Sequence, residues 1–259
     1  MRTMRAVRLH DTGLVVEEIE VPVPQEGEAL VRVHAAAITR DELTWPEDRL
    51  PAIPSYELSG VIAQVADDVH GVTVGDDVFA LTPFDRDGVA AEYAVVAAAL
   101  LAPRPQRLTH VESAALPMTG LSAWQGLFEY GNLRDGERVT VVGATGGVGH
   151  LAVQLARGQL AEEGDRSDLA FDTVGGDSLL SVIESAGRVV SIAEEAEGAT
   201  YFVVEPNRAQ LAELGRRADA GELAPAIDSV FPLEEAEAAF VRVAERGKQG
   251  KVVLRVADD

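Results

Sequence analysis

The spacing of hydrophobic positions changes partway along the chain. Up to about residue 105, short apolar or alternating stretches are separated by Gly, Pro and Asp. The clearest of them are Met4–Leu9, Leu14–Val21, Ala29–Ala35, Leu58–Val65 and Val78–Leu81. Strands at such intervals predict a barrel-like all-β region. The spacing then becomes helical from Glu112 to about Tyr130, where Gly131-Asn132 is a typical stop signal.

The second half alternates between strand and helix patterns. Arg138–Val142 is a short buried-strand pattern, Gly143–Gly149 is rich in glycine, and an amphipathic helix follows through Leu151 and Leu155. Further strands are expected at Leu169–Phe171, Arg188–Ile192, Tyr201–Val204 and Val252–Val256, and further helices at Arg208–Ala220 and Leu233–Glu245. The predicted fold class is therefore α/β plus β, with a β-barrel first and a Rossmann-type parallel α/β region second.

The glycine loop is the first candidate site. Gly143, Gly146 and Gly149 would let the backbone turn tightly and lie close to a pyrophosphate, while the helix after them would direct its free N–H groups at the anion. A tight strand-to-helix turn that binds nothing has the same pattern. The placement between a strand and a helix favours a nucleotide site.

Together with Leu116–Trp124, this loop resembles the zinc-free quinone oxidoreductases of the medium-chain dehydrogenase/reductase superfamily. The resemblance continues through Tyr56–Gly60, Val74–Phe79, Phe171–Gly176 and Gly250–Leu254. It implies a GroES-like substrate domain over residues 1–112, joined by the C-terminal segment 226–259. It also implies a Rossmann-type domain over residues 113–225 that holds NADPH, with the substrate in the cleft between the two.

The resemblance also assigns roles to individual residues. Thr39, Asp41 and Tyr56 are the candidate catalytic groups: a hydroxyl that positions the substrate, a proton relay, and a phenol that steadies a developing oxyanion. Trp45 and Phe84 would form an apolar wall for the substrate. The expected cofactor-binding residues are Thr119, Gly143, Gly146, Gly147, Val148, Gly149, Ser191, Phe202, Val203 and Lys251.

Each assignment has a structural alternative. Thr39 followed by Glu42 fits a helix capping box. Tyr56 fits a half-buried structural tyrosine, and Trp45 and Phe84 fit ordinary packing near prolines.

Zinc chemistry is not expected. Alcohol-oxidising members of the superfamily use a catalytic zinc, and the positions that resemble its protein ligands are Thr39, Tyr56 and Thr119 here. Three hydroxyls in a chain without cysteine are a poor zinc site. Reduction of a quinone or an activated double bond is the family chemistry that remains.

The cofactor half is shorter than the resemblance implies. A βαβ unit needs about 30 residues or more, but the helix after the loop ends near Arg157 and the next strand begins at Asp168. Asp165 and Asp168 have the spacing of a ribose-binding acid, yet neither follows a strand. Either the domain is naturally reduced, which would weaken nucleotide binding, or segments are missing from this sequence. A lost strand would expose a sheet edge, which a homodimer could cover.

Charge narrows the choice of partners. The chain has 22 basic and 43 acidic residues, and its formal net charge of −21 makes nucleic acid and membranes poor partners. With no signal-peptide or membrane-span pattern, we expect a cytoplasmic protein with a small-molecule substrate. Three functions remain open: an NAD(P)H-dependent reductase of a quinone or enone, a cofactor-independent cyclase or isomerase of a polyketide-like compound, and a non-catalytic binding relic.

Overall fold

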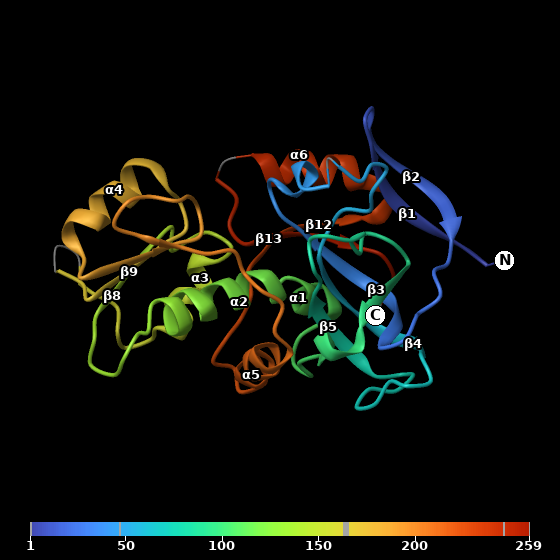
Figure 1. The fold of residues 1–259 in the computed structure, drawn as a ribbon, viewed down its shortest axis with the longest axis horizontal. Coiled ribbons are helices and arrows are strands. Elements are labelled where there is room, and N and C mark those ends of the chain that lie inside the picture. The colour runs from blue at the N-terminus through green and yellow to red at the C-terminus, as the bar shows by residue number, and fades with distance from the viewer. Residues whose placement is uncertain (1, 47, 163–165, 246, 259) are drawn as a thin grey trace.

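The computed structural model describes residues 2–46, 48–162, 166–245 and 247–258. Its elements form two lobes (Figure 1), a β-barrel and an α/β lobe, with helices α2 (Pro117–Trp124) and α5 (Arg208–Asp219) between them. No helix among the described residues has the length and apolar character needed to cross a membrane.

The barrel follows the predicted alternation closely. A hairpin of β1 (Thr3–His10) and β2 (Gly13–Glu20) precedes the main sheet. The strands that follow are β3 (Glu28–Ile38), β4 (Glu57–Val65), β5 (Asp77–Leu81), β6 (Tyr93–Ala97) and β7 (Ala102–Pro103). The last two were not predicted, because short alanine-rich runs carry little strand signal.

Strand β3 organises this lobe. It pairs with β4 on one side, while on the other its first half pairs with β6 and its second half with β13 (Lys251–Arg255). β12 (Ile227–Pro232) pairs with β13 in parallel, so the C-terminal segment belongs to the barrel sheet. As a result, Lys251 lies beside Thr39, which follows the end of β3.

The predicted helix from Glu112 to Tyr130 is divided. It consists of α1 (His110–Ala114), then α2, then a π-helical turn over Gln125–Tyr130. Pro117 explains the first break, because proline favours the first turn of a new helix. A capping box formed by Thr109 and Glu112 starts α1.

The α/β lobe is small. Its parallel strands are β8 (Val139–Val142), β9 (Leu169–Asp172), β10 (Arg188–Ser191) and β11 (Thr200–Tyr201), in the order β11-β10-β9-β8. Its helices are α3 (Gly149–Leu155) and α4 (Gly176–Ser185). The strand predicted over Tyr201–Val204 stops at Tyr201, and α4 was not predicted.

Strand β8 forms one edge of this sheet. Its outer neighbours among the described residues are Gln159–Ala161, whose hydrogen bonds to β8 are confined to Val139. The Val139 N–H donates to the Gln159 carbonyl (2.8 Å), and the Ala161 N–H donates to the Val139 carbonyl (2.9 Å). The rest of β8 is only partly buried, whereas β9 is buried throughout.

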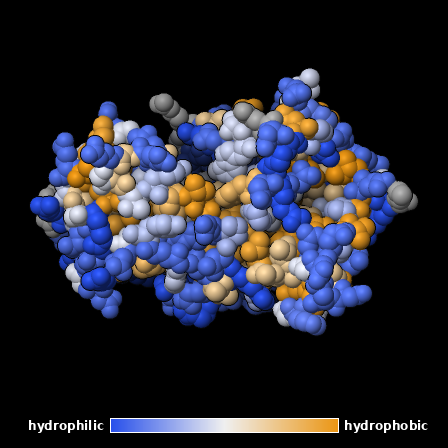
Figure 2. Space-filling model, in the orientation of Figure 1, coloured by the Kyte–Doolittle hydropathy of each residue, from blue (hydrophilic) through white to orange (hydrophobic). Residues whose placement is uncertain are grey.

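Two large apolar clusters hold the molecule together. One fills the barrel and includes α6 (Ala236–Ala244), which follows the short turn η4 (Leu233–Glu235). The other joins Tyr56 and Phe79 of the barrel to α2, α5 and the α/β sheet. The surface seen in Figure 2 is mostly hydrophilic, with apolar side chains exposed between the lobes.

Candidate functional site

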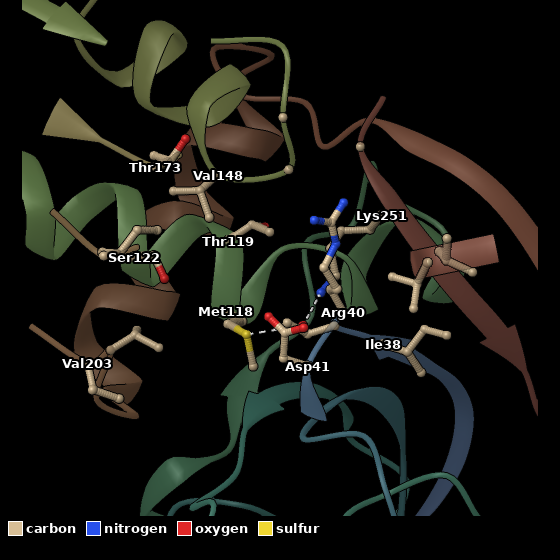
Figure 3. A pocket seen from close by; sticks show the side chains of 18 of the residues that line it. Ile38, Arg40, Asp41, Met118, Thr119, Ser122, Val148, Thr173, Val203 and Lys251 are labelled. Atoms are coloured by element: carbon tan, nitrogen blue, oxygen red, sulfur yellow. Dashed lines mark hydrogen bonds between the residues drawn. The ribbon is translucent and has the colours of Figure 1, made fainter. Parts of the chain in front are cut away.

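A cavity of about 590 Å³ lies where the barrel, α2, the glycine loop and β13 meet (Figure 3). This size is typical of small-molecule sites. Most of the predicted site residues line it: Thr39, Asp41, Trp45, Phe84, Thr119, Gly146, Gly147, Val148, Phe202, Val203 and Lys251.

Three predicted cofactor residues shape the site without lining it. Gly143 has a φ of +82°, and a Cβ on Gly149 would lie 2.1 Å from the Gly143 carbonyl oxygen, so both glycines are needed for the turn itself. Ser191 is fully buried, and its hydroxyl donates to Asp172 Oδ2 (2.8 Å). These residues set the path of the chain around the cavity.

Tyr56 also lies outside the cavity. It is fully buried behind Trp45 and Phe84, with ring centroids 5.5 and 5.3 Å away. Burial raises the pKa of its phenol, and the nearby Arg49 guanidinium partly opposes that shift. The described residues place no partner at regular hydrogen-bond geometry on the Tyr56 hydroxyl. The structure therefore brings Tyr56 to the back of the aromatic wall and does not place its phenol where a substrate would be.

Thr39 and Lys251 form the polar centre of the cavity. Lys251 Nζ donates to Thr39 Oγ1 (2.8 Å), and the Thr39 hydroxyl donates to Met118 Sδ (3.3 Å). Lys251 also forms an ion pair with Glu57, whose carboxylate is inaccessible to solvent and accepts the Met118 N–H (2.8 Å). The ammonium is thus held at the cavity wall by a buried acid behind it.

A second buried acid supports the same turn. Glu42 accepts the Thr39 N–H (3.0 Å) through one carboxylate oxygen and the Ser55 N–H (3.2 Å) through the other. Burial raises the pKa of Glu42 to about 8, with Lys251 acting in the opposite direction. Burial also raises the pKa of Glu57, again opposed by Lys251.

The capping-box alternative for Thr39 is therefore half fulfilled. Glu42 accepts the Thr39 backbone N–H as a capping box requires. The Thr39 hydroxyl, however, bonds to Lys251 and Met118 instead of capping the 3₁₀ turn that begins at Glu42. Its side chain belongs to the cavity.

The cavity also has two cationic side chains that were not among the predicted site residues. Arg40 is exposed and Lys248 is partly buried, and both line the cavity with Lys251. Burial and the positive charge of Arg40 lower the pKa of Lys248. Neither Arg40 nor Lys248 has a carboxylate within ion-pair distance in the described part of the chain. Lys248 and Lys251, the only lysines, lie on either side of Gly250, a pattern that could have indicated an anion site.

The positions predicted to replace zinc ligands do not converge. Thr39 and Thr119 line the cavity, Tyr56 does not, and the Thr119 hydroxyl donates within its own helix to the Ala115 carbonyl (2.7 Å). Within the described ranges, no three His, Asp or Glu side chains gather as metal ligands would.

Comparison with known proteins agrees with this architecture. Residues 25–106 match the alcohol dehydrogenase GroES-like domain family, and residues 147–254 match a family described as zinc-binding dehydrogenase. The chain belongs to the medium-chain dehydrogenase/reductase superfamily. Within this superfamily it is an oxidoreductase, and its relatives include proteins named quinone oxidoreductase.

Several relatives of this oxidoreductase have descriptive names. A probable mitochondrial zinc-binding oxidoreductase of Arthroderma benhamiae is 28% identical, covering 95% of this chain and 94% of the relative. The 2-methylene-furan-3-one reductase of Solanum lycopersicum is also 28% identical, over 91% of this chain and 74% of the relative. The quinone oxidoreductase of Mus musculus is 33% identical, but over 60% of this chain and 50% of its own length.

Solved structures confirm the fold of the oxidoreductase. An alcohol dehydrogenase superfamily protein from Novosphingobium aromaticivorans superposes with a TM-score of 0.86 at 26% identity, covering 98% of this chain and 99% of the other. The quinone oxidoreductase from Coxiella burnetii gives a TM-score of 0.88 at 22% identity, over 98% and 100% of the two chains.

The alignment with the Arthroderma benhamiae relative also bears on the reduced lobe. It runs over 311 positions, although this oxidoreductase has 259 residues. The relative therefore contains segments that have no counterpart in this chain.

Proposed function

We propose that this oxidoreductase is a zinc-independent reductase of a quinone or conjugated enone that takes its hydride from NADPH or NADH. The observation that carries the proposal is the arrangement of one cavity: Lys251 and Thr39 on the barrel side, and Gly146-Gly147 on the α/β side. A reduced nicotinamide bound there would supply hydride to the acceptor.

The glycine loop supports a nicotinamide nucleotide at this place. A Cβ on Gly147 would lie 3.4 Å from Thr119 Cγ2 and 3.7 Å from the Gly250 carbonyl oxygen, so a larger side chain would fill the gap between loop and barrel. Thr119, Phe202 and Val203 add a partly apolar lining on the same side. A planar ring with a ribose attached fits this combination of backbone and apolar surface.

The barrel side supplies the polarising groups. Negative charge develops on the acceptor oxygen when hydride arrives at a quinone or enone, and a fixed ammonium and hydroxyl stabilise such charge. Lys251 and Thr39 provide these two groups, and Glu57 holds the ammonium in place. This pair would do the work that a zinc ion does in the alcohol-oxidising relatives. Asp41, exposed at the cavity, stays the predicted proton relay to solvent.

The apolar wall favours a flat, conjugated substrate. The Trp45 and Phe84 rings meet edge to face, with centroids 5.1 Å apart, and Tyr56 packs behind both. The 2-methylene-furan-3-one reductase and an NADPH-dependent alkenal/one oxidoreductase of Arabidopsis thaliana, 26% identical, are named for such acceptors.

A redox-neutral cyclase or isomerase on the same cavity is the second candidate. The edge position of β8 favours it, since the described residues form no strand beyond β8 of the kind that a dinucleotide fold normally has. A binding relic is disfavoured, because a relic has no need of a buried Glu57–Lys251 pair directed at a cavity.

The test is a screen of quinones and conjugated enones with NADPH and NADH. Oxidation of the nucleotide is followed by absorbance, using protein dialysed against EDTA. We expect turnover that persists after dialysis and is not increased by added zinc. Turnover that appears only with zinc would overturn zinc independence, and the absence of any nucleotide-linked turnover would favour the redox-neutral candidate.

A further inference from the structure

The two halves of a dinucleotide would meet very different surroundings in this chain. Thr119, Gly147 and Val203 line the cavity in which the proposed function would place the nicotinamide ribose. In a complete Rossmann fold, the adenosine lies beyond the first strand, beside a further strand whose acidic residue binds the ribose.

The connection after α3 is too short to build that second half. Only residues 156–168 separate the end of α3 from the start of β9, whereas a strand, helix and returning strand need about 30 residues. The described part of this connection contacts β8 at Val139, at the end of the strand away from the glycine loop. The described part of the connection therefore places no strand at the loop end of β8, where an adenosine would need one.

The two candidate ribose-binding acids do not alter this conclusion. The Asp168 carboxylate accepts the Arg138 N–H (2.9 Å), which fixes it at the start of β8 and away from the glycine loop. Asp165 lies outside the described residues.

The cavity does contain a cluster of cationic side chains that would attract an anion. Arg40, Lys248 and Lys251 line it in a chain whose formal net charge is −21. Figure 3 shows the Arg40 and Lys251 side chains projecting between the barrel and the glycine loop. Lys251 is paired with Glu57, which leaves Arg40 and Lys248 as the cations available to a ligand within the described residues. A phosphate bound in this cavity would be attracted by both of them.

We infer that this site recognises only the nicotinamide ribose 5′-phosphate half of the cofactor. Reduced nicotinamide mononucleotide is therefore a complete ligand, and the adenosine of NADH or NADPH lies outside any pocket. The 2′-phosphate that distinguishes NADPH from NADH then meets no partner and gives no selectivity. This inference rests on the proposed function, since it concerns the nucleotide of that same cavity.

The experiment is calorimetric titration of the 259-residue protein with four ligands: NADPH, NADH, reduced nicotinamide mononucleotide and adenosine 2′,5′-bisphosphate. We expect the first three dissociation constants to agree within about fivefold, and the adenosine compound not to bind at millimolar concentration. Reduced nicotinamide riboside, which lacks the phosphate, should bind at least tenfold more weakly than the mononucleotide.

Two single variants test whether Lys248 and Arg40 contact the phosphate of the mononucleotide. Lys248→Ala and Arg40→Ala should each weaken binding of the mononucleotide about five- to tenfold and leave binding of the riboside unchanged. Arg255→Ala is the matched control, because Arg255 is an exposed cation on the same strand as Lys251 but outside the cavity. It should change neither affinity.

The outcomes separate this inference from the proposed function. NADPH binding more than fiftyfold tighter than the mononucleotide, or binding of adenosine 2′,5′-bisphosphate, would overturn the inference while the reductase proposal stands. Failure of all three nicotinamide nucleotides to bind at millimolar concentration would overturn both. Equal losses for mononucleotide and riboside in Lys248→Ala would contradict the phosphate assignment.

Discussion

The two sides of the cavity differ in how firmly the surrounding structure holds their residues. On the barrel side, Thr39 and Lys251 lie on paired strands or next to them, and buried acids occupy the space behind them. On the α/β side, the strands are short, β8 is an edge strand, and the described residues form no further strand where a complete Rossmann fold binds adenosine. This difference indicates that the chemistry depends on the barrel side.

The largest loss of stability is expected when the Glu57–Lys251 ion pair on the barrel side is broken. Lys251→Met leaves Glu57 buried without its partner, and the loss of one member of a buried pair costs about 3–5 kcal/mol. Urea unfolding should show a drop of this size. The double variant Glu57→Gln/Lys251→Met should recover part of it, and Arg255→Ala should stay within about 0.5 kcal/mol of the parent. A Lys251→Met protein as stable as the parent would show that the barrel side is not held by this pair.

Stability should also fall as pH rises. The pKa of Glu42 is raised to about 8 from an ordinary value of 4.5, and the pKa of Glu57 is raised as well. The folded state therefore binds more protons than the unfolded state between about pH 4.5 and pH 8, so the free energy of unfolding decreases across that window. We expect a decrease of roughly 2–4 kcal/mol between pH 5 and pH 8 by urea unfolding.

Substitution of Glu42 checks the source of this slope. The Glu42→Gln variant has no titrating proton at this position. Its free energy of unfolding should therefore decrease less steeply with pH than that of the parent. Glu237→Gln, at an exposed glutamate of α6, should keep the parent slope. A stability that rises from pH 5 to pH 8 in the parent would contradict the assignment.

Removing the Thr39 hydroxyl should affect turnover more than folding. Thr39→Val preserves shape but takes away the group that Lys251 donates to, and we expect kcat/KM for quinone or enone reduction to fall about 10- to 100-fold. The unfolding free energy should change by about 1 kcal/mol. Thr44→Val, at an exposed threonine in the same turn, is the control and should keep full turnover. Full activity in Thr39→Val would remove Thr39 from the proposed mechanism.

The smallest effect is expected on the α/β side. Gly147→Val would put a branched side chain into the gap beside Thr119, and we expect about tenfold weaker nucleotide binding by calorimetry with little change in stability. Gly149→Ala should weaken binding and also lower stability by about 1–3 kcal/mol, because its Cβ would meet the Gly143 carbonyl at 2.1 Å and distort the turn. Unchanged binding in Gly147→Val would mean that the loop does not border the ligand.

Local patterns predicted much of the fold. The alternation in β1 to β5 was sufficient because each strand buries one face in the barrel, and the strand-loop-helix order around Gly143 is a short-range signal. The reduced cofactor lobe followed from counting residues between Arg157 and Asp168. Strands β6 and β7 and helix α4 carry weaker patterns and were not predicted.

The site was harder to predict because it depends on contacts between distant segments. The bond between Thr39 and Lys251 joins residues 212 positions apart, and no spacing rule reveals it. The capping-box pattern at Thr39 and Glu42 describes only the backbone half of what those residues do. The position of Tyr56 behind Trp45 and Phe84 depends on how three connecting segments outside the strands pack together.

The central claim is that this cavity carries hydride from a nicotinamide to a conjugated acceptor. It is tested most directly by single turnover with a reduced nicotinamide nucleotide that carries two deuterium atoms at C4, followed by mass spectrometry of the product of an accepted enone. The account predicts one deuterium per product, at the carbon β to the carbonyl, from labelled NADPH, NADH and reduced nicotinamide mononucleotide alike. A product that contains no deuterium, or a substrate that is converted to an isomer without oxidation of the nucleotide, would contradict it.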